Sequence, residues 1–472
     1  MKTAQEYIDS IRAMHHEAYL FGEKIENPVD HPIIRPSINS VAATYELAEQ
    51  SEWESLMTAT SHLTGKRINR FTHIHQGVDD LVAKSKMNRM LGAYTGSCFQ
   101  RCVGMDALNA LSIVTHKLAS KDRFLDYLQY VQDNDLVCCG AMTDAKGNRS
   151  LRPSEQFDPD QYLNVIGRGK DGIVVSGAKL HQTGAINSHE IIVMPTRAMS
   201  EKDKDYAVSF AIPSDTKGIM YIYGRQSCDM RKHEEGFDRG NVLYGGQECM
   251  VIFNNVFVPW ERVFMCGEYE FTGQLVEQFA AYHRHSYACK SGIGDVLIGA
   301  VQLLAQYQGT DKASHIKDKI VEMIHFNETL ACGSLACAYE GHEEPSGTYA
   351  VNPLLANVAK LNVTRLPFEI ARLAQEIAGG ILGTMPSYYD YSSKIGRYVA
   401  KYLKPRQEVK TEDRMRVLRL IENLCMGSGA VSYLTESMHG AGSPQAQRIM
   451  IQRLADMTAK VSSAKRLCGV KE

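Results

Sequence analysis

Two cysteines four residues apart are the first residues whose types and spacing could bind a metal. Cys98 and Cys102 enclose the tripeptide Phe99-Gln100-Arg101. If this segment is helical, residues i and i+4 lie on one face, so both thiols could hold one metal ion or cluster. The alternative is a pair of small buried residues in a core, which is common for free cysteine. The spacing is less specific than Cys-x-x-Cys and leaves both interpretations open.

A second segment, 282–290, gathers several titratable groups within nine residues. Its sequence YHRHSYACK contains His283, Tyr287, Cys289 and Lys290. Buried polar groups need partners, so a core helix seldom concentrates so many of them. The segment therefore predicts a functional pocket in which an imidazole, a phenol and an ammonium could act together. The alternative is a solvated helix face, or a single histidine with a partner in the core.

Four further segments combine glycine with polar side chains: LTESMHGAGSP at 434–444, QEIAGG at 375–380, HQTG at 181–184 and GGQE at 245–248. In the first, glycines would let the backbone approach a ligand, and the following helix start would offer free N–H groups to an anion. It could also be an ordinary turn between helices. The Gly379-Gly380 pair is typical of a helix C-cap and could also admit a phosphate or an adenosine. HQTG and GGQE could be polar turns, with Glu248 a surface carboxylate.

The elements that must position these residues follow a simple order. Residues 1 to about 140 predict helices, with Thr3 and Glu6 as a capping box. From about 150 to 265, short β-branched runs bounded by Gly, Asp, Asn or Pro, such as residues 219–223, predict a compact antiparallel β domain, and Gly-Lys-Asp-Gly at 169–172 predicts a hairpin turn. From about 270 onward the apolar residues recur with a helical period, which predicts a helical bundle. One apolar stripe, at 450–461, belongs to a helix expected to begin with Ser443 as N-cap and Pro444 at its first position. We expect an α+β fold, mostly α, with domains at 1–145, 146–270 and 271–472.

Length and composition exclude several classes of protein. The chain has 472 residues, 44% apolar and 22% charged, with a net charge of −2, which excludes a disordered chain, a collagen and a repeat fibre. There is no basic excess for nucleic acid. The run at 296–305 is too short to span a membrane, and the first residues do not form a signal peptide. We expect a cytoplasmic protein whose 12 cysteines are not a disulfide framework.

Together these segments resemble one family, the 4-hydroxybutyryl-CoA dehydratases, within the wider group of flavin-dependent 4-hydroxyphenylacetate 3-monooxygenase-like proteins. The matching stretches run from near residue 20 to near 455, so they cover almost the whole chain. They are FGEKIENPVDHPIIRPSINS, SCFQRCVGMDA, GAMTDAKGNR, GAKLHQTGAINSHE, DKDYAVSF, YGRQSCD, GGQE, YHRHSY, DKIVEMIHFNETL and RMRVLRLIENLCMGSGAVSYLTESMHGAGSPQAQRIM. The long C-terminal stretch and the Cys-x-x-x-Cys stretch are specific, whereas HQTG is shared more widely with the monooxygenases.

The resemblance implies an acyl-CoA dehydrogenase-like architecture and a homotetramer with FAD at subunit contacts. It also implies a [4Fe–4S] cluster and an acyl-CoA substrate. The implied reaction converts 4-hydroxybutyryl-CoA to crotonyl-CoA and water, with isomerisation of vinylacetyl-CoA. Flavin would act as a one-electron reservoir and iron as a Lewis acid on the leaving oxygen, so that the reaction is redox-neutral overall.

The resemblance also implies roles for individual residues. The cluster ligands would be Cys98, Cys102, His283 and Cys289. His283 or Tyr287 would move protons, Glu248 and Glu436 would orient substrate or assist, and Lys290 would supply positive charge. FAD would lie against Met142, Thr143, Arg149 and Thr183. Gln375, Gly379 and Gly380 would reach the adenosine of a neighbouring subunit.

The chain departs from this family pattern in one place. The family has one more residue between the histidine and the last cysteine, whereas His283 and Cys289 are six apart here. On a regular helix a six-residue step turns the second side chain about 120° away from the first. Either the backbone is distorted locally, as at a π-bulge, or Cys289 is not a ligand.

Two other functions remain open at this stage. One is a cluster-free flavoprotein, either a vinylacetyl-CoA isomerase or a reduced-flavin monooxygenase of aromatic compounds. The other is a metal-storing or redox-sensing scaffold. Cys98 and Cys102 favour the dehydratase over the first, because the monooxygenase relatives do not need them. Glu248, Tyr287 and Glu436 argue against the second, because storage needs no proton transfer.

Overall fold

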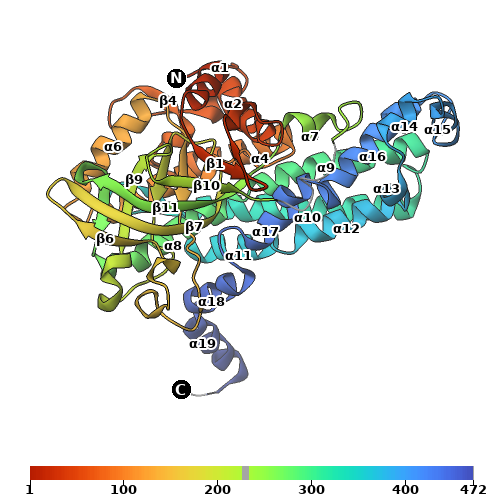
Figure 1. Cartoon of the computed structure of the whole chain (residues 1–472). Coiled ribbons are helices and arrows are strands. Elements are labelled where there is room, and N and C mark those ends of the chain that lie inside the picture. The colour runs from red at the N-terminus through yellow and green to blue at the C-terminus, as the bar shows by residue number, and fades with distance from the viewer. Residues whose placement is uncertain (226–232, 471–472) are drawn as a thin grey trace.

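The computed structural model describes residues 1–225 and 233–470, in which helices flank a β layer (Figure 1). The helices are α1 Ala4–Arg12, α2 Arg35–Ala48, α3 Glu54–Met57, α4 Val78–Thr95, α5 Cys102–Thr115, α6 Lys121–Asp133, α7 Arg239–Leu243, α8 Tyr269–Ser286, α9 Cys289–Gln308, α10 Ser314–Tyr339, α11 Pro353–Val363, α12 Leu366–Ala378, α13 Ile381–Thr384, α14 Tyr388–Ser392, α15 Gly396–Tyr402, α16 Thr411–Met426, α17 Glu436–His439, α18 Pro444–Leu454 and α19 Met457–Cys468. The strands are β1 Glu17–Leu20, β2 Glu23–Ile25, β3 Thr58–Thr60, β4 Arg67–Asn69, β5 Cys138–Ala141, β6 Asn164–Arg168, β7 Gly172–Thr183, β8 Glu190–Val193, β9 Val208–Pro213, β10 Ile219–Tyr223, β11 Glu248–Pro259, β12 Val263–Cys266, β13 His342–Glu343 and β14 Tyr349–Ala350. The expected α+β class is confirmed.

Two sheets form the β layer. The larger has the order β2-β1-β10-β11-β7-β6 and the smaller has the order β12-β9-β8-β5. Their inward side chains share one buried cluster that includes Val175, Val193 and Val251. Most pairings are antiparallel, as expected, but β1 pairs with β10 and β5 pairs with β8 in parallel. These parallel pairs join strands from distant parts of the chain, which local turn signals cannot reveal.

The first 140 residues are not wholly helical, contrary to the sequence-based expectation. Strands β1 and β2 extend the larger sheet, and β5 forms an edge of the smaller one. The first part of the chain therefore completes both sheets of the middle part. The division into domains at 1–145, 146–270 and 271–472 stays a prediction.

The two long strands β7 and β11 bring two of the polar segments together. Residues 169–172 form the predicted turn into β7, with Gly169 N–H donating to Gly172 O at 2.8 Å. The antiparallel register then places Thr183, at the end of β7, opposite Glu248, at the start of β11. HQTG and GGQE thus meet at one end of the larger sheet.

The helices after residue 268 form a bundle around a buried cluster that includes Ile293, Leu297 and Leu418. Helix α4, from the first part of the chain, packs closely against α9. A Cβ added at Gly92 would overlap the carbonyl oxygen of Cys289, and one added at Gly292 would overlap the carbonyl oxygen of Arg89. Glycine is therefore required on both helices for the two backbones to approach. This close contact fixes the segment that carries Cys289.

One stretch, Tyr269–Gln308, is long and apolar enough to cross a membrane when judged by length and composition alone. Its most apolar window is 67% buried within the fold. The stretch is also interrupted, because α8 ends at Ser286 and α9 begins at Cys289. Burial against protein accounts for its hydropathy, as in the core helices of other bundles.

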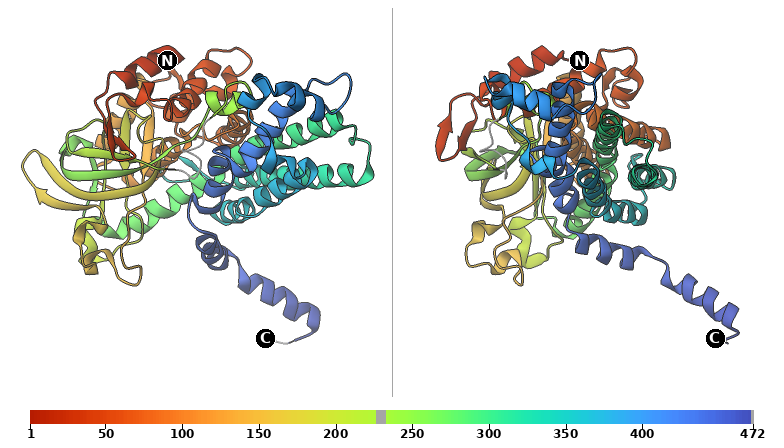
Figure 2. Two further views of the ribbon diagram at one scale, coloured as in Figure 1. Left: turned by 45° about the vertical axis from the view of Figure 1, so that its right-hand side comes forward. Right: turned by 90° about the vertical axis from the view of Figure 1, so that its right-hand side faces the viewer.

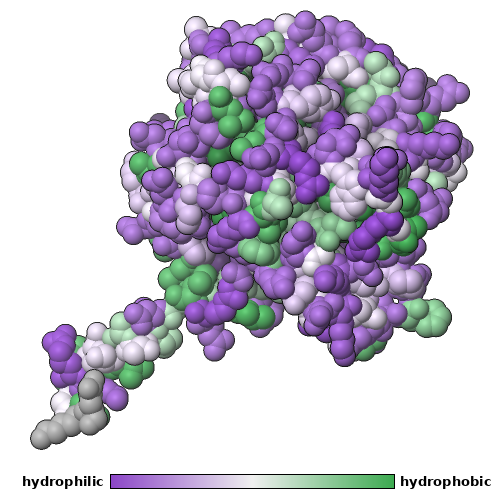
Figure 3. Space-filling view, turned by 90° about the vertical axis from the view of Figure 1, so that its left-hand side faces the viewer, coloured by the Kyte–Doolittle hydropathy of each residue, from purple (hydrophilic) through white to green (hydrophobic). Residues whose placement is uncertain are grey.

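The last two helices form an arm that projects from the body (Figure 2). Ser443 and Pro444 start α18 as predicted. The expected apolar stripe at 450–461 does not form one helix, because α18 ends at Leu454 and α19 begins at Met457. Met457, Val461 and Leu467 are exposed. Hydrophobic side chains are visible along this arm in Figure 3.

Candidate active site

Cys98 and Cys102 are both buried, but they do not share a helix. Helix α4 ends at Thr95 with Gly96 in the left-handed conformation (φ 58°), and α5 begins at Cys102. Gln100 between them also has a positive φ of 66°. The helical i, i+4 argument is therefore wrong, and a turn rather than helix pitch brings the two thiols to the same site. A Cβ on Gly246, from GGQE, would lie 3.3 Å from the Cys98 Cβ, so this segment packs against the turn.

Cys289 joins these two thiols because the chain is not a regular helix between His283 and Cys289. Helix α8 ends at Ser286, and α9 starts afresh at Cys289. The 120° displacement expected for a regular six-residue step does not apply, and Cys289 packs in the same buried cluster as Cys102. Of the two alternatives left open by the sequence, the structure supports local distortion, in the form of a helix break rather than a π-bulge.

The three thiols fit a metal centre chemically. Burial raises the pKa of Cys98 and Cys102 well above the ordinary value, and it raises that of Cys289 as well. The negative charge of neighbouring thiolates raises the pKa values of Cys98 and Cys102 further. The positive charge of Lys290 lowers the pKa values of all three cysteines. A bound cation supplies the positive charge that such a group of thiolates needs. Three free thiols and an imidazole therefore form a donor set suited to an iron–sulfur cluster.

His283 lies beside this group with its ring fixed on two sides. It stacks on Phe279 at 5.5 Å between ring centroids, and its Nδ1 lies 2.9 Å from Asp106 Oδ2. Ligand atoms of Cys102, Asp106 and His283 all lie within 4.8 Å of one another. Burial alone would raise the pKa of Asp106, but the charges of Lys84 and His283 hold it below the ordinary value. The Nε2 atom of His283 is left available to a metal.

Tyr287 occupies the break between α8 and α9. Its hydroxyl donates to the backbone oxygen of Glu436 at 3.2 Å, and its ring meets that of His283 edge-on. Two ammonium groups lie over the ring, Lys290 Nζ at 5.3 Å and Lys360 Nζ at 4.5 Å from its centroid. Burial raises the pKa of Tyr287 well above its ordinary value, so the phenol holds its proton at neutral pH.

Lys290 and Glu436 form a buried ion pair with Nζ and Oε2 2.7 Å apart. The ammonium also donates to the backbone oxygen of Ser432 at 2.5 Å. That oxygen belongs to a π-helical turn, Val431–Thr435, which immediately precedes Glu436. Such turns re-aim side chains and are frequent at functional sites. Here the π-helical turn brings Glu436 to Lys290.

Glu248 accepts a hydrogen bond from Thr183 Oγ1 to its Oε1 at 3.1 Å. Burial and the negative charge of Glu436 raise the pKa of Glu248 from 4.5 to about 7, while the bond from Thr183 acts in the opposite direction. A carboxyl group with this pKa exchanges its proton readily near neutral pH. Glu248 is therefore not the surface carboxylate that the sequence also allowed.

Three of the residues expected to contact FAD lie together. Met142 and Thr143 follow β5, and their backbone oxygens accept from Lys179 Nζ and Leu180 N–H of β7, the strand that ends at Thr183. Arg149 lies on the exposed loop beyond them. Gln375, Gly379 and Gly380 are exposed at the end of α12, and Gly379 (φ 77°) is its C-cap. Figure 1 places α13, which follows them, at the far end of the bundle from β7, so one chain does not bring the two groups together.

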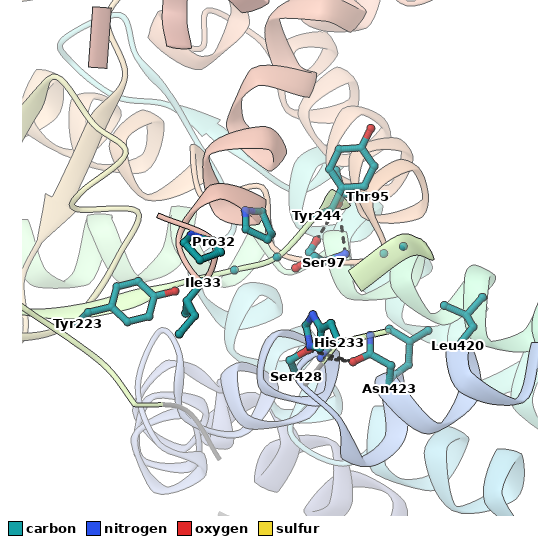
Figure 4. Close-up of a pocket in the computed structure, with 17 residues that line it drawn as sticks. Pro32, Ile33, Thr95, Ser97, Tyr223, His233, Tyr244, Leu420, Asn423 and Ser428 are labelled. Atoms are coloured by element: carbon teal, nitrogen blue, oxygen red, sulfur yellow. Dashed lines mark hydrogen bonds between the residues drawn. The ribbon is translucent and has the colours of Figure 1, made fainter. Parts of the chain in front are cut away.

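A cavity of about 240 Å³ opens beside the thiol-bearing turn (Figure 4). It is lined by residues from 32–36, 95–97, 240–246 and 420–429, together with Tyr223 and His233. Among the described residues that line it, none is an Asp, Glu, Lys or Arg. Ser97 and Gly246 at its wall adjoin Cys98, so the cavity lies beside the turn that carries two of the buried thiols.

Comparison with known proteins identifies the family of this chain. Family models described as the N-terminal and C-terminal parts of 4-hydroxyphenylacetate 3-hydroxylase match residues 3–265 and 272–469. A 4-hydroxybutyryl-CoA dehydratase/vinylacetyl-CoA-Delta-isomerase from Clostridium aminobutyricum is 56% identical over 489 aligned residues, covering 100% of both chains. The chain belongs to the 4-hydroxybutyryl-CoA dehydratase family. The resemblance inferred from the sequence is therefore confirmed.

Solved structures extend this likeness to the fold. An oxygen-tolerant archaeal 4-hydroxybutyryl-CoA dehydratase from N. maritimus is 53% identical, with a TM-score of 0.97 over 100% of this chain and 95% of that chain. The oxygenase component of 4-hydroxyphenylacetate 3-monooxygenase complexed with FAD has a TM-score of 0.88 at 23% identity, covering 99% and 98%. Residues 226–229 of the matching stretch YGRQSCD lie outside the described residues.

Three functional candidates were missed by the sequence reasoning: Lys84, Asp106 and Lys360. Each is a charged residue in an otherwise largely buried part of a helix, and each is fully buried in the structure. This pattern could have identified them from the sequence. A charged residue is almost never fully buried unless it is paired, so one within an apolar helix indicates a specific partner. Asp106 also lies four residues after Cys102, on the same face of α5.

Gly440→Ala is expected to displace Tyr287, because a Cβ at this position would overlap the Tyr287 hydroxyl. The ring is enclosed by Lys290, Lys360 and His283, so it cannot move freely. Overpacking of this kind costs about 1–3 kcal/mol. Thermal unfolding should show that loss, and activity should fall with FAD content unchanged. Unchanged activity would show that the position of the Tyr287 hydroxyl is not critical.

Proposed function

We propose that this protein is an enzyme that dehydrates 4-hydroxybutyryl-CoA to crotonyl-CoA and isomerises vinylacetyl-CoA, using FAD and a [4Fe–4S] cluster. The observation that carries the proposal is the convergence of three buried thiols and His283 beside Glu248, Glu436, Tyr287 and Lys290. A chain 56% identical to a dehydratase/isomerase holds this set in one place. A cluster-free monooxygenase would have no use for the three thiols.

In this proposal Cys98, Cys102, Cys289 and the Nε2 atom of His283 hold the cluster. Met142, Thr143, Arg149 and Thr183 hold FAD, which the monooxygenase oxygenase component also binds. When bound, FAD would supply one-electron exchange and the cluster an iron Lewis acid for the leaving hydroxyl group. Cys98, Cys102 and Cys289 are buried and the His283 side chain is only 12% exposed, which limits the access of bulk water to the site.

The remaining side chains move and hold protons. Glu248 accepts or returns a proton near neutral pH, because its pKa of about 7 suits a general base. Tyr287 keeps its phenolic proton beside His283 and can donate it toward the leaving oxygen. Lys290 fixes Glu436, so that this carboxylate orients the substrate. The neutral cavity beside Cys98 is where we place the uncharged acyl chain and thioester.

Assembly and location complete the proposal. The acyl-CoA dehydrogenase-like arrangement is supported by the order of helices, sheets and helices along the chain. A cytoplasmic homotetramer would let the exposed Gln375, Gly379 and Gly380 reach FAD of another subunit. The exposed apolar side chains of α19 support burial of the arm against a second copy.

The experiment that tests the proposal is to purify the protein without oxygen, count iron, sulfide and FAD per chain, and assay 4-hydroxybutyryl-CoA. Four irons with one FAD and formation of crotonyl-CoA are expected. FAD without iron would favour an isomerase or a monooxygenase instead. Iron without flavin would favour a redox scaffold.

Thr183→Val is expected to move the acidic limb of the kcat/KM profile to higher pH. As a base, Glu248 must be ionised, so the rate should rise with pH through about 7 in the native protein. The hydrogen bond from Thr183 lowers the pKa of Glu248, so the substitution should raise that pKa. Rates should be compared at equal FAD occupancy. A limb that moves to lower pH, or does not move, would exclude Glu248 as that base.

A further inference from the structure

A buried ion pair lies directly behind His283. Lys84 of α4 and Asp106 of α5 both have side chains with 0% exposure, and Nζ lies 2.6 Å from Oδ1. Burying two charges incurs a large desolvation penalty, so such a pair is weak evidence for a purely stabilising role. The pair must be explained by what else it contacts.

The second carboxylate oxygen of Asp106 contacts the imidazole. Asp106 Oδ2 lies 2.9 Å from His283 Nδ1, and Ser286 Oγ donates to both carboxylate oxygens at 2.9 and 3.0 Å. An ionised carboxylate only accepts hydrogen bonds, so His283 must carry its proton on Nδ1. The lone pair of a neutral His283 is then on Nε2.

Helix α5 carries a metal ligand and this carboxylate on one face. Asp106 follows Cys102 by four residues, and one ligand atom from each of Cys102, Asp106 and His283 lies within 4.8 Å of the other two. The imidazole therefore lies close both to the thiol with which it would share a cluster and to the carboxylate that orients it. Metal-binding histidines commonly make such a bond through their second nitrogen.

Helix α4 holds the rest of the same turn of α8. Lys84 Nζ donates to the Tyr282 backbone oxygen at 3.1 Å, and Asn88 Nδ2 donates to that of Ser286 at 3.1 Å. Ser85 Oγ lies 2.9 Å from His285 Nε2. Side chains on α4 therefore bind the last turn of α8 just before the helix break. These contacts keep the end of α8 from fraying, and so they fix the position of His283.

We propose that Asp106, itself fixed by Lys84, is the positioning residue that holds the Nδ1–H tautomer of His283 and presents Nε2 to iron beside Cys102. The inference rests on the proposed function only for the identity of the metal. It accounts for two fully buried charges that the catalytic set leaves unexplained, and for the orientation of the one ligand that is not a thiol.

The test compares iron retention in anaerobically purified proteins challenged with a chelator. Lys84→Met combined with Asp106→Leu removes both charges together and leaves no unpaired buried ion. Loss of such an orienting contact typically lowers metal affinity about 10- to 100-fold, so iron should be lost at correspondingly lower chelator concentration. Asp106→Glu keeps the charge but displaces it, and should lose iron in the same direction. FAD content and circular dichroism verify the fold.

Asn109→Ala is the matched control, because it removes buried hydrogen bonds between α5 and the backbone of His73 and His75 without touching Asp106, Lys84 or His283. It should retain iron like the native protein; iron loss equal to that of the paired variant would contradict a specific role for Asp106. The proposal would also be overturned if both the Lys84→Met/Asp106→Leu variant and Asp106→Glu fold and retain iron like the native protein. If the Lys84→Met/Asp106→Leu variant does not fold, native iron retention in Asp106→Glu alone would overturn it. If the native chain itself holds no iron, the cluster assignment fails separately, and Co²⁺ added to the metal-free chains becomes the probe for the same comparison.

Discussion

The Cys98→Ala protein is expected to lose dehydration of 4-hydroxybutyryl-CoA while it still binds FAD. Cys98 lies in the turn between α4 and α5, so its removal deletes a ligand without breaking a helix or a strand. Met142, Thr143, Arg149 and Thr183, which are proposed to contact FAD, lie in the loop after β5 and at the end of β7 and are unaffected. Iron per chain and crotonyl-CoA formation should fall together, because the leaving hydroxyl would lose its Lewis acid.

Cys425→Ala provides the control for this substitution. Cys425 is also a buried free cysteine, but it lies in α16 and contacts the backbone oxygen of Ala371. It should keep both iron and activity apart from a small loss of stability. Full dehydration by Cys98→Ala would remove the thiol group from the mechanism.

Lys290→Met is the second substitution with a large expected effect. It would leave the Glu436 carboxylate buried without its ion-pair partner, which typically costs about 3–5 kcal/mol. It would also remove the positive charge that favours the thiolates of Cys98, Cys102 and Cys289. Both the midpoint of thermal unfolding and the rate of dehydration should fall sharply.

Lys360→Met is the contrasting variant, because Lys360 lies over the same Tyr287 ring. Among the described residues no carboxylate pairs with Lys360, and its ammonium donates to the backbone oxygen of Ser437 at 2.7 Å. Burial, with the charges of Lys290 and Arg284, lowers its pKa well below the ordinary 10.5. The unfolded chain therefore binds the extra proton, and native stability should rise with pH up to about 10.5.

The methionine at 360 should abolish that rise in stability and leave the protein about as stable as the native one at neutral pH. Unfolding measured across pH separates the two lysines. A loss for Lys360→Met as large as that for Lys290→Met would contradict the distinction between a paired and an unpaired buried ammonium.

Much of the arrangement was predictable from the sequence because local patterns decide it. The turn at 169–172, the strand at 219–223 and the N-cap at Ser443 follow from residue types over a few positions. The parallel pairing of β1 with β10 was not predictable in this way, since it joins segments some 200 residues apart without a local signal.

The site was predictable in its residue types but not in its geometry. Helical spacing correctly paired Cys98 with Cys102 for the wrong reason, because a turn containing Gln100 at positive φ replaces the helix. The six-residue step from His283 to Cys289 suggested misalignment, whereas the structure has a helix break between them and packs α9 closely against α4. Tertiary packing fixed both positions, and sequence periodicity does not report such packing.

The most direct test of the central claim is anomalous diffraction at the iron edge from crystals grown without oxygen. The account predicts iron density enclosed by the sulfur atoms of Cys98, Cys102 and Cys289 and by Nε2 of His283. Iron density that lies away from Cys289, or its absence between these four side chains in an active protein, would contradict the account.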